Sequence, residues 1–275
     1  MLNKAEYIYS VQDQDTLGKT QKIIPLINYS KPAPQRCLDM LLAKLRGEPF
    51  QTEVVMEEPE KISIPVLEKP LNQTTVLLLT DGGLVPRGNP DRIPSTNACC
   101  FGVYSIAGKR RLQARDYEVS HQGYDFSYVR EDPNRLLPVD ALRELERMGV
   151  IGRLYDHFLS TAGVMTSSED SIRLGQQIAD YVEAQPVDAV LITSACGTST
   201  RCGAYIGMAI ESRGIPVVQV TNLTQISADT GISRIVKGNN ICYPYGKPSL
   251  DRSGEYNYRR QLVMHTLQML KEMSE

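Results

Sequence analysis

The sequence lacks several features that would each point to a particular class of protein. It has no long basic run and its formal net charge is −2. We therefore expect no nucleic-acid partner, because a phosphate backbone requires a concentrated basic patch. No apolar stretch approaches the roughly 20 residues that span a bilayer, so we expect no membrane association. The first residues, Met1–Glu6, are not typical of a signal peptide, because charged and polar side chains come early. These absences favour a small-molecule or protein partner.

Closely spaced cysteine pairs and histidines are also scarce. The chain has three histidines and six scattered cysteines, namely Cys37, Cys99, Cys100, Cys196, Cys202 and Cys242. A chain of 275 residues, 41% of them hydrophobic, can form a core without disulfides. We therefore interpret the protein as cytoplasmic, in a reducing compartment where cysteines are more often catalytic or metal-binding than structural. Cys99 and Cys100 are expected to pack in a loop.

The N-terminal part has little core of its own. Residues 35–46 predict one short amphipathic helix, because four leucines share a face (Leu38, Leu41, Leu42 and Leu45). Residues 53–70 are rich in Glu, Lys and Pro, as in a linker or extended arm. We interpret residues 1–73 as an N-terminal arm that lies on another subunit or wraps its own body.

Residues 74–275 predict an α/β domain. Apolar runs at 76–79, 187–193 and 215–221 indicate strands, and they alternate with helical segments at 139–148, 168–183, 202–213 and 258–273. Such alternation is typical of βαβ units and predicts a mainly parallel, doubly wound sheet with helices on both faces. Ligands of such sheets bind outside the carboxyl ends of the strands.

Cys196 follows the strand at 187–193 directly and precedes a helix. Free N–H groups at a helix N-terminus favour a thiolate, and Arg201 could add positive charge. Gly197 allows a close approach of the backbone to a substrate. Cys202 lies six residues further on, where a loop that folds back could bring it to Cys196. Two alternatives stay open from the residues alone: both cysteines can be small buried side chains, or part of a structural zinc site, although the usual spacing is missing.

Three blocks of the sequence carry a resemblance to a known family. They read VDAVLITSACGTSTRCGAYIGMAIESRGIPVV at 187–218, LLLTDGGLVPRGNPDRIPSTNA at 77–98 and SHQGYDFSYVREDPNRLLPVDALRELERMGVIGRLYDHFLST at 120–161. They resemble the selenoprotein subunit of the anaerobic glycine, sarcosine and betaine reductases (component B) and of D-proline reductase, and the three blocks occur in order along the chain. The resemblance runs from about residue 74 to 250 and leaves the first 70 residues outside.

Two positions depart from the family pattern. Cys196 stands where the family has selenocysteine, and Ser199 stands where it has the middle one of three cysteines. A thiolate is a poorer nucleophile than a selenolate, so slower turnover is expected unless the site compensates. The resemblance also allows selenocysteine at position 196 in the native protein. Without a cysteine at position 199, Cys202 is the candidate resolving thiol.

The resemblance implies a mechanism. In the family, a substrate amine forms a Schiff base with a pyruvoyl group on a partner subunit, and the carbon–nitrogen bond is then cleaved reductively with thiols as reductant. By this analogy the chain is an oligomeric reductase subunit that carries no cofactor of its own, binds a pyruvoyl-bearing partner or other reductase components, and is inactive alone. Cys196 would be the nucleophile, Cys202 the resolving thiol and His121 an acid–base group. The predicted substrate contacts are Asp81, Gly82, Gly83, Arg87, Asp125, Gly197, Thr198, Ser199 and Arg201.

Purely structural explanations of these residues also remain open. His121 can be a hydrogen-bonded loop histidine, Asp81 to Gly83 can be simple turn residues, and Arg87 can belong to a loop fixed by salt bridges. A non-catalytic scaffold subunit that keeps an inert Cys196 is the main alternative function. A general disulfide oxidoreductase is a third, although Ser199 interrupts the Cys-x-x-Cys pattern.

Overall fold

The computed structural model describes residues 30–50 and 64–271. The chain divides into two compact units, Met1–Glu58 and Pro59–Glu275, and each is described by itself. The first part of the predicted linker, residues 53–63, lies outside the described residues. Within the described ranges, no helix combines the length and the apolar character that crossing a membrane requires.

The first unit contains the predicted amphipathic helix. Helix α2 (Ala33–Arg46) begins after Pro32 and ends at Gly47, which adopts the left-handed conformation (φ 67°) that glycine tolerates best. The four predicted leucines, Leu38, Leu41, Leu42 and Leu45, are all partly or largely exposed within the described residues.

The second unit is built on a six-stranded sheet with the order β3-β5-β1-β6-β7-β8. Only β3 is antiparallel to its neighbour. A separate antiparallel pair, β2 and β4, lies outside this sheet. The strands are β1 (Thr75–Thr80), β2 (Leu84–Pro86), β3 (Gly102–Ser105), β4 (Tyr117–Val119), β5 (Arg153–Ser160), β6 (Ala189–Thr193), β7 (Val217–Thr221) and β8 (Ile235–Lys237). The prediction of an α/β fold with a mainly parallel sheet is confirmed.

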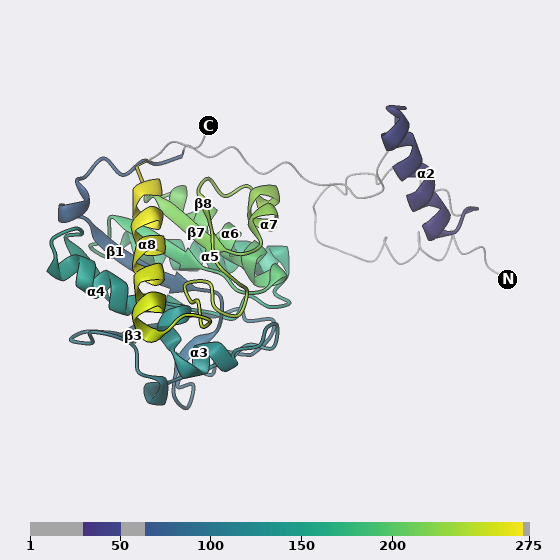
Figure 1. The fold of residues 1–275 in the computed structure, drawn as a ribbon. Helices are drawn as coiled ribbons and strands as arrows, with labels where there is room; N and C mark the ends of the chain where they lie inside the picture. The colour runs from purple at the N-terminus through teal and green to yellow at the C-terminus, as the bar shows by residue number, and fades with distance from the viewer. Residues whose placement is uncertain (1–29, 51–63, 272–275) are drawn as a thin grey trace. The chain divides into compact units, whose positions relative to one another are not determined.

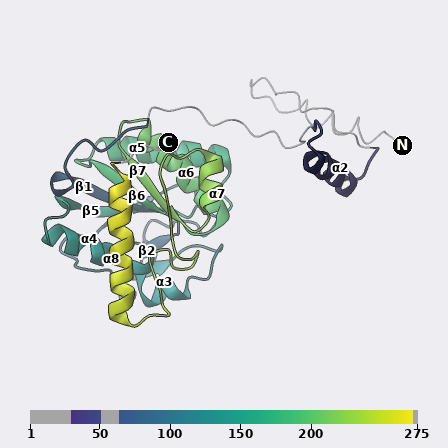
Figure 2. The ribbon, with the colours of Figure 1, turned by 45° about the horizontal axis from the view of Figure 1, so that its top comes forward.

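Helices cover both faces of this sheet, as predicted, and α8 lies across one face (Figures 1 and 2). They are α3 (Ser127–Glu131), α4 (Val139–Arg147), α5 (Ser168–Glu183), α6 (Gly197–Glu211), α7 (Thr224–Thr230) and α8 (Arg252–Met269), with 3-10 turns η1 (Leu71–Gln73), η2 (Ala114–Asp116) and η3 (Pro133–Arg135). Helices α4 and α8 pack on one face, and α5 and α6 pack on the other.

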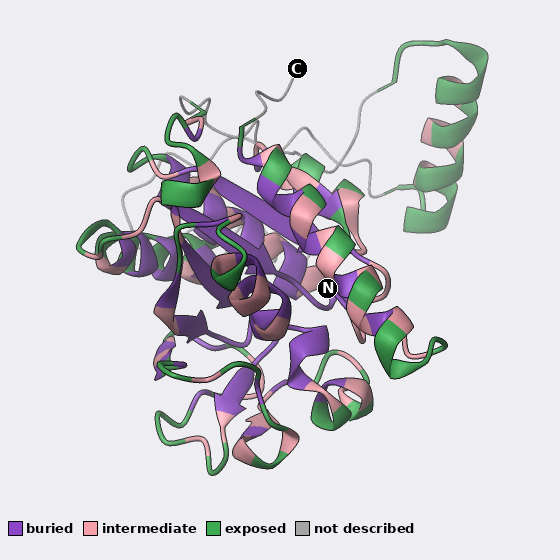
Figure 3. Ribbon diagram, turned by 60° about the vertical axis from the view of Figure 1, so that its left-hand side comes forward, coloured by how far each residue is buried: buried purple, intermediate pink, exposed green. Residues whose placement is uncertain are grey.

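Alternating side chains of each strand divide the core into these two layers. Leu78 and Leu191 face α4 and α8, whereas Leu77 and Ile192 face α5 and α6. The central strands are buried on both sides, as Figure 3 shows by their colour. A parallel sheet covered on both faces produces the continuous apolar runs that the sequence displays.

The chain leaves β1 and β6 in opposite directions. After β1 it returns to β5 on one side, and after β6 it returns to β7 on the other side. Adjacent strands whose connections diverge form a crevice at their carboxyl ends, where ligands of open α/β sheets bind. In this chain Asp81 follows β1 and Cys196 follows β6, so the crevice lies where the sequence places its candidate nucleophile.

Candidate functional site

Cys196 occupies the N-cap position of α6, directly after the short turn that follows β6. Its backbone is extended (φ −77°, ψ 178°) and its carbonyl accepts the N–H of Thr200 at 2.8 Å. The residue is 9% exposed. The helix therefore starts at Gly197, five residues before the predicted start at residue 202, and the free N–H groups of its first turn lie next to the cysteine.

His121 lies close to Cys196, and its hydrogen bonds fix its tautomer. The backbone N–H of Gly123 donates to Nδ1 at 3.0 Å, so the neutral ring carries its proton on Nε2. Nε2 is 2.7 Å from Ser199 Oγ and 4.0 Å from the Cys196 sulfur. Burial lowers the pKa of His121 to about 4. At neutral pH the ring is therefore uncharged, and its one N–H donates to Ser199 beside the cysteine.

Two hydroxyl groups from the first turn of α6 complete the surroundings of the sulfur. Ser199 Oγ lies 3.3 Å and Thr198 Oγ1 lies 3.7 Å from Cys196 Sγ. Ser199 accepts the Nε2 proton of His121, and Thr198 accepts the backbone N–H of Met165 at 2.9 Å. Because each oxygen already accepts a fixed donor, its own hydrogen is free to point at the sulfur. Both residues were predicted substrate contacts, and the structure places them around the nucleophile.

The segment that carries His121 is held against β1 by a glycine. Gly83 has a φ of +74°, and an added Cβ would lie 2.2 Å from the carbonyl oxygen of Ser120. The backbones of Gly83 and Ser120 are joined by a hydrogen bond of 2.8 Å. Tyr124 donates to the carbonyl of Gly82 at 2.9 Å, and its ring packs at a tilt against the His121 ring. The glycines predicted to line the site thus position His121.

Asp81 lies underneath the turn between β6 and α6. It is fully buried and accepts hydrogen bonds from the Ser194 hydroxyl and from the N–H of Ala195. Gln219 donates to Ser194 Oγ and to the Thr200 carbonyl, both at 2.8 Å. Burial raises the pKa of Asp81 well above its ordinary value, although its hydrogen bonds oppose this shift. Asp81 supports the turn, and direct contact with a substrate would require this turn to open.

Residues 161–166, here called the covering segment, lie beside Cys196 and were missed by the sequence analysis. An added Cβ on Gly123 would lie 2.8 Å from both the Cys196 sulfur and a methyl group of Val164. Met165 is 62% exposed and has a φ of 59°, and its N–H holds Thr198. Nothing in the local sequence marks this segment, because its contacts come from a parallel strand and a helix far along the chain.

Cys202 is not brought into contact with Cys196. It is fully buried in the apolar cluster shared with α5, and burial raises its pKa to about 12. Six residues of α-helix rise by about 9 Å, whereas disulfides join Cα atoms about 4.4–6.8 Å apart. Its role as resolving thiol stays a prediction, and it would require the start of α6 to open.

Three other predicted site residues lie apart from the sulfur. Arg87 is exposed and donates to the carbonyl of Arg115 at 2.7 Å. Arg201 donates to the carbonyl of Thr166 at 2.8 Å and thereby holds the covering segment. Asp125 is exposed, and its pKa is lowered by the backbone N–H of the nearby Ser127. Across the part of the chain that the structure describes, no group of three or more His, Cys, Asp or Glu side chains could hold a metal ion.

Comparisons with known proteins identify several that are similar to this chain. A family model described as glycine/sarcosine/betaine reductase selenoprotein B matches residues 3–195. The glycine reductase complex component B subunit gamma of Carboxydothermus hydrogenoformans is 44% identical over 236 residues, which are 86% of this chain and 54% of the relative. The sarcosine reductase complex component B subunit beta of Peptoclostridium acidaminophilum is 40% identical over 243 residues (88% and 56%). The D-proline reductase subunit gamma of Acetoanaerobium sticklandii is 32% identical over 192 residues (68% and 76%). No solved structure matches.

The extent of these matches corrects one expectation. The family match begins at residue 3, so the prediction that the first 70 residues lie outside the resemblance was wrong. The match ends directly before Cys196. The chain also spans about half the length of the component B relatives it matches.

Proposed function

The chain belongs to the glycine/sarcosine/betaine reductase selenoprotein B family, and on that premise we propose that Cys196 is the thiolate nucleophile of a reductase complex. The substrate is a small amine or amino-acid derivative, and its carbon–nitrogen bond, or a related carbon–heteroatom bond, is cleaved reductively. The named relatives are subunits of glycine, sarcosine and D-proline reductases.

The observation that carries the proposal is the direction of the hydrogen bonds around the sulfur. Ser199 and Thr198 each accept from another donor and can direct their own hydrogen at Cys196. His121 Nε2 donates its one proton to Ser199 Oγ, which leaves the Ser199 hydrogen free for the sulfur. Hydrogen bonds to the charged form of a group favour that form, and the start of α6 adds its free N–H groups. The site is therefore suited to hold a negative sulfur without a charged neighbour.

The proposed reaction proceeds through a carbon–sulfur bond between the substrate and Cys196. The Cys196 thiolate attacks the carbon that bears the leaving nitrogen, a carbon–sulfur bond forms, and the nitrogen departs with the bonding electron pair and takes up a proton. A reducing thiol then attacks the sulfur, which releases the reduced carbon as it gains a proton and leaves Cys196 in a disulfide. A second thiol regenerates the Cys196 thiol.

The activating group is proposed to come from a partner subunit. A pyruvoyl carbonyl on such a partner would supply an electron sink that weakens the carbon–nitrogen bond of an amine. The chain's own residues fit such an approach, because Gly123 is exposed and an added Cβ there would lie 2.8 Å from the sulfur. A side chain at position 123 would clash with the sulfur, and glycine avoids this clash. Selenocysteine in the native protein at position 196 would meet the same donors as the sulfur.

The reducing thiol is proposed to come from outside the chain. Ser199 removes the nearest thiol of the family pattern, and Cys202 is fully buried. The Cys196 adduct faces Gly123 and the covering segment, where an external thiol can reach it without unfolding α6.

The proposal is tested by alkylating each of the six cysteines with iodoacetamide and reading the rates by peptide mass spectrometry. Cys196 is expected to react before the other five. In a complex reconstituted with its partner subunits, Cys196→Ser should lower amine turnover by more than about a thousandfold, since it removes the nucleophile. Cys37→Ser, in the first unit, is the matched control, and the chain alone should not turn over amines.

The opposite results point to the alternative function. An inert Cys196, or full turnover by the Cys196→Ser complex, would identify the chain as a non-catalytic scaffold subunit. Turnover of an amine by the isolated chain would contradict the need for a partner.

A further inference from the structure

Two adjacent cysteines, Cys99 and Cys100, face solvent just before β3. They lie in a loop, as expected, but both thiols are free and both residues are exposed and not packed. The Cys99 thiol donates to the Asn97 carbonyl at 3.6 Å. The pKa of Cys100 is raised, mainly by partial burial and further by Cys99 and the carboxylate of Asp91. The two thiols therefore lie within electrostatic range of each other.

The backbone around these cysteines is joined to the covering segment three times. Two threonine hydroxyls of the covering segment donate to carbonyls of the cysteine loop, and one N–H of the loop donates to the covering segment. The bonds are Thr161 Oγ1 to Cys100 O (2.8 Å), Asn97 N to Val164 O (2.9 Å) and Thr166 Oγ1 to Ala98 O (3.5 Å). The last is the weakest, because the Thr166 hydroxyl also lies 3.3 Å from the Ala162 carbonyl and has one hydrogen to share between the two. A change in the loop backbone would therefore alter the hydrogen bonds of residues 161–166.

The covering segment in turn touches the nucleophile. The N–H of Met165 holds the Thr198 hydroxyl, which lies 3.7 Å from the Cys196 sulfur. Val164 and the sulfur flank the same point beside Gly123. A continuous path of hydrogen bonds and contacts thus leads from the exposed cysteine pair to the reactive sulfur.

We propose that Cys99 and Cys100 form a second, redox-active dithiol site that small-molecule disulfides oxidise, and that the oxidised form slows the reaction of Cys196. One thiolate of the pair attacks the disulfide, which forms a mixed disulfide and releases one thiolate. The neighbouring cysteine then attacks the mixed disulfide and releases the second. The cysteine pair loses two electrons and two protons, and the small disulfide becomes two thiols. Only the effect on Cys196 rests on the proposed function.

Ring closure between adjacent residues requires the backbone to move. Neighbouring Cα atoms are about 3.8 Å apart, which is shorter than the roughly 4.4–6.8 Å that disulfides usually join. The backbone between Ala98 and Phe101 must therefore change conformation. The Ala98 and Cys100 carbonyls that bind the covering segment lie within this stretch.

The test uses glutathione disulfide on the full chain. Peptide mass spectrometry should show the peptide with Cys99 and Cys100 lacking two hydrogens in the wild type and in Cys37→Ser. The variants Cys99→Ser and Cys100→Ser should instead keep a thiol or a glutathione adduct. Because Cys196 meets the same reagent in every variant, the comparison among them isolates the effect of the dithiol.

Iodoacetamide then reports on Cys196. We expect Cys196 to be alkylated about tenfold more slowly in the oxidised wild type than in the treated Cys100→Ser variant, an ordinary coupling between two sites. Equal rates would overturn the coupling, and a peptide that never loses two hydrogens would overturn the dithiol site. A Cys196 that is inert even in the fully reduced wild type would contradict the proposed function, while the peptide result would still decide the dithiol.

Phenylarsine oxide gives a measurement without oxidation. This probe bridges two neighbouring thiols with loss of water, and the wild type should retain it until a small dithiol is added. Cys99→Ser and Cys100→Ser should not retain it. Retention by either variant would show that the two thiols do not act as a pair.

Discussion

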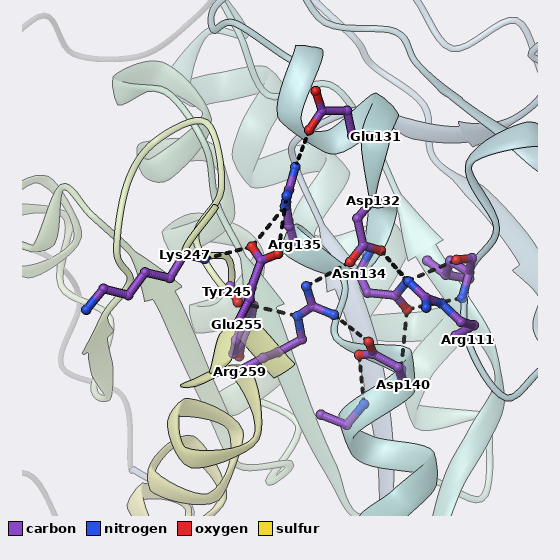
Figure 4. Close-up of polar contacts among 12 residues, drawn as sticks. Arg111, Glu131, Asp132, Asn134, Arg135, Asp140, Tyr245, Lys247, Glu255 and Arg259 are labelled. Atoms are coloured by element: carbon purple, nitrogen blue, oxygen red, sulfur yellow. Dashed lines mark hydrogen bonds and ion pairs between the residues drawn. The ribbon is translucent and has the colours of Figure 1, made fainter. Parts of the chain in front are cut away.

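Two buried polar regions of the second unit differ in the charge of the groups that form them. Around Cys196, neutral donors surround one sulfur, and among the described residues no charged side chain hydrogen-bonds to it. Between α8 and residues 131–140, full charges face one another (Figure 4). Arg259, with its side chain 3% exposed, pairs with Asp132 at 2.9 Å and with Asp140. Arg135 binds Glu255 through two hydrogen bonds of 2.9 and 3.2 Å.

The difference separates a stabilising region from a reactive one. The charged network joins residues more than 100 positions apart in the sequence, so it ties the C-terminal helix to the middle of the chain. Burial alone would raise the pKa of Asp132, but Arg259 and Asn134 lower it overall. Burial raises the pKa of Asp140 despite the same arginine. Arg259 thus mainly holds Asp132 as a carboxylate, whereas the Cys196 region contains no such fixed charge pair.

The largest expected effect comes from breaking the charged network. Arg259→Met keeps much of the apolar length of the side chain but leaves two buried carboxyl groups without their cation. We expect the free energy of unfolding to fall by about 3–5 kcal/mol, as when one partner of a buried ion pair is removed. Urea unfolding at pH 7 measures this change.

Two variants serve as controls for this comparison. Arg213→Met removes exposed ion pairs with Asp180 and Glu183 and should cost less than about 1 kcal/mol. Cys196→Ser should leave the free energy of unfolding within about 0.5 kcal/mol of the wild type. If Arg259→Met lowered the free energy of unfolding as little as Arg213→Met, the charged network would not be the region that stabilises the fold.

The second effect uses pH to change the charge of His121 in the Cys196 region. The pKa of His121 falls from 6.5 to about 4 on folding, so between these values the unfolded chain binds more protons than the folded one. Stability from the neutral ring is fully present above pH 6.5 and is lost as the pH falls towards 4. The whole window corresponds to about 3 kcal/mol. The contribution of Asp132 persists here, because its lowered pKa places its loss at more acidic pH.

This prediction is measured by urea unfolding of the wild type and His121→Gln at several pH values between 7 and 4. The difference in stability between the two proteins should shrink steadily with acid, because the variant has no ring to protonate. A difference independent of pH would show that His121 is not held neutral in the folded protein.

The sequence predicted the strand that leads to Cys196, because an apolar run followed by a turn and Cys-Gly is a local pattern. It did not predict β5, because Arg153, Asp156 and His157 interrupt the apolar run. These polar residues occur in a strand that pairs with the antiparallel β3 on one side. The contact between His121 and Ser199 joins residues 78 positions apart, and no single sequence reports such a pairing. Arg87 and Asp125 lie in the resembling blocks, yet Arg87 binds the carbonyl of Arg115 and Asp125 binds the N–H of the nearby Ser127.

The smallest expected effect distinguishes the two hydroxyl donors of the site. Ser199 is closer to the sulfur than Thr198, 3.3 against 3.7 Å, and it also receives the His121 proton. We expect Ser199→Ala to slow alkylation of Cys196 about tenfold, which corresponds to one hydrogen bond to a charged group. Thr198→Val, which keeps the shape of the side chain, should slow it only about threefold because its contact is longer. Rates from iodoacetamide labelling at pH 7 measure both variants. Ser199→Cys, which restores a thiol at this position, should form a disulfide with Cys196 on mild oxidation, because the serine oxygen is already in contact with the sulfur. Equal rates for Ser199→Ala and the wild type would mean that the start of α6, rather than the hydroxyl relay from His121, controls the reactivity of Cys196.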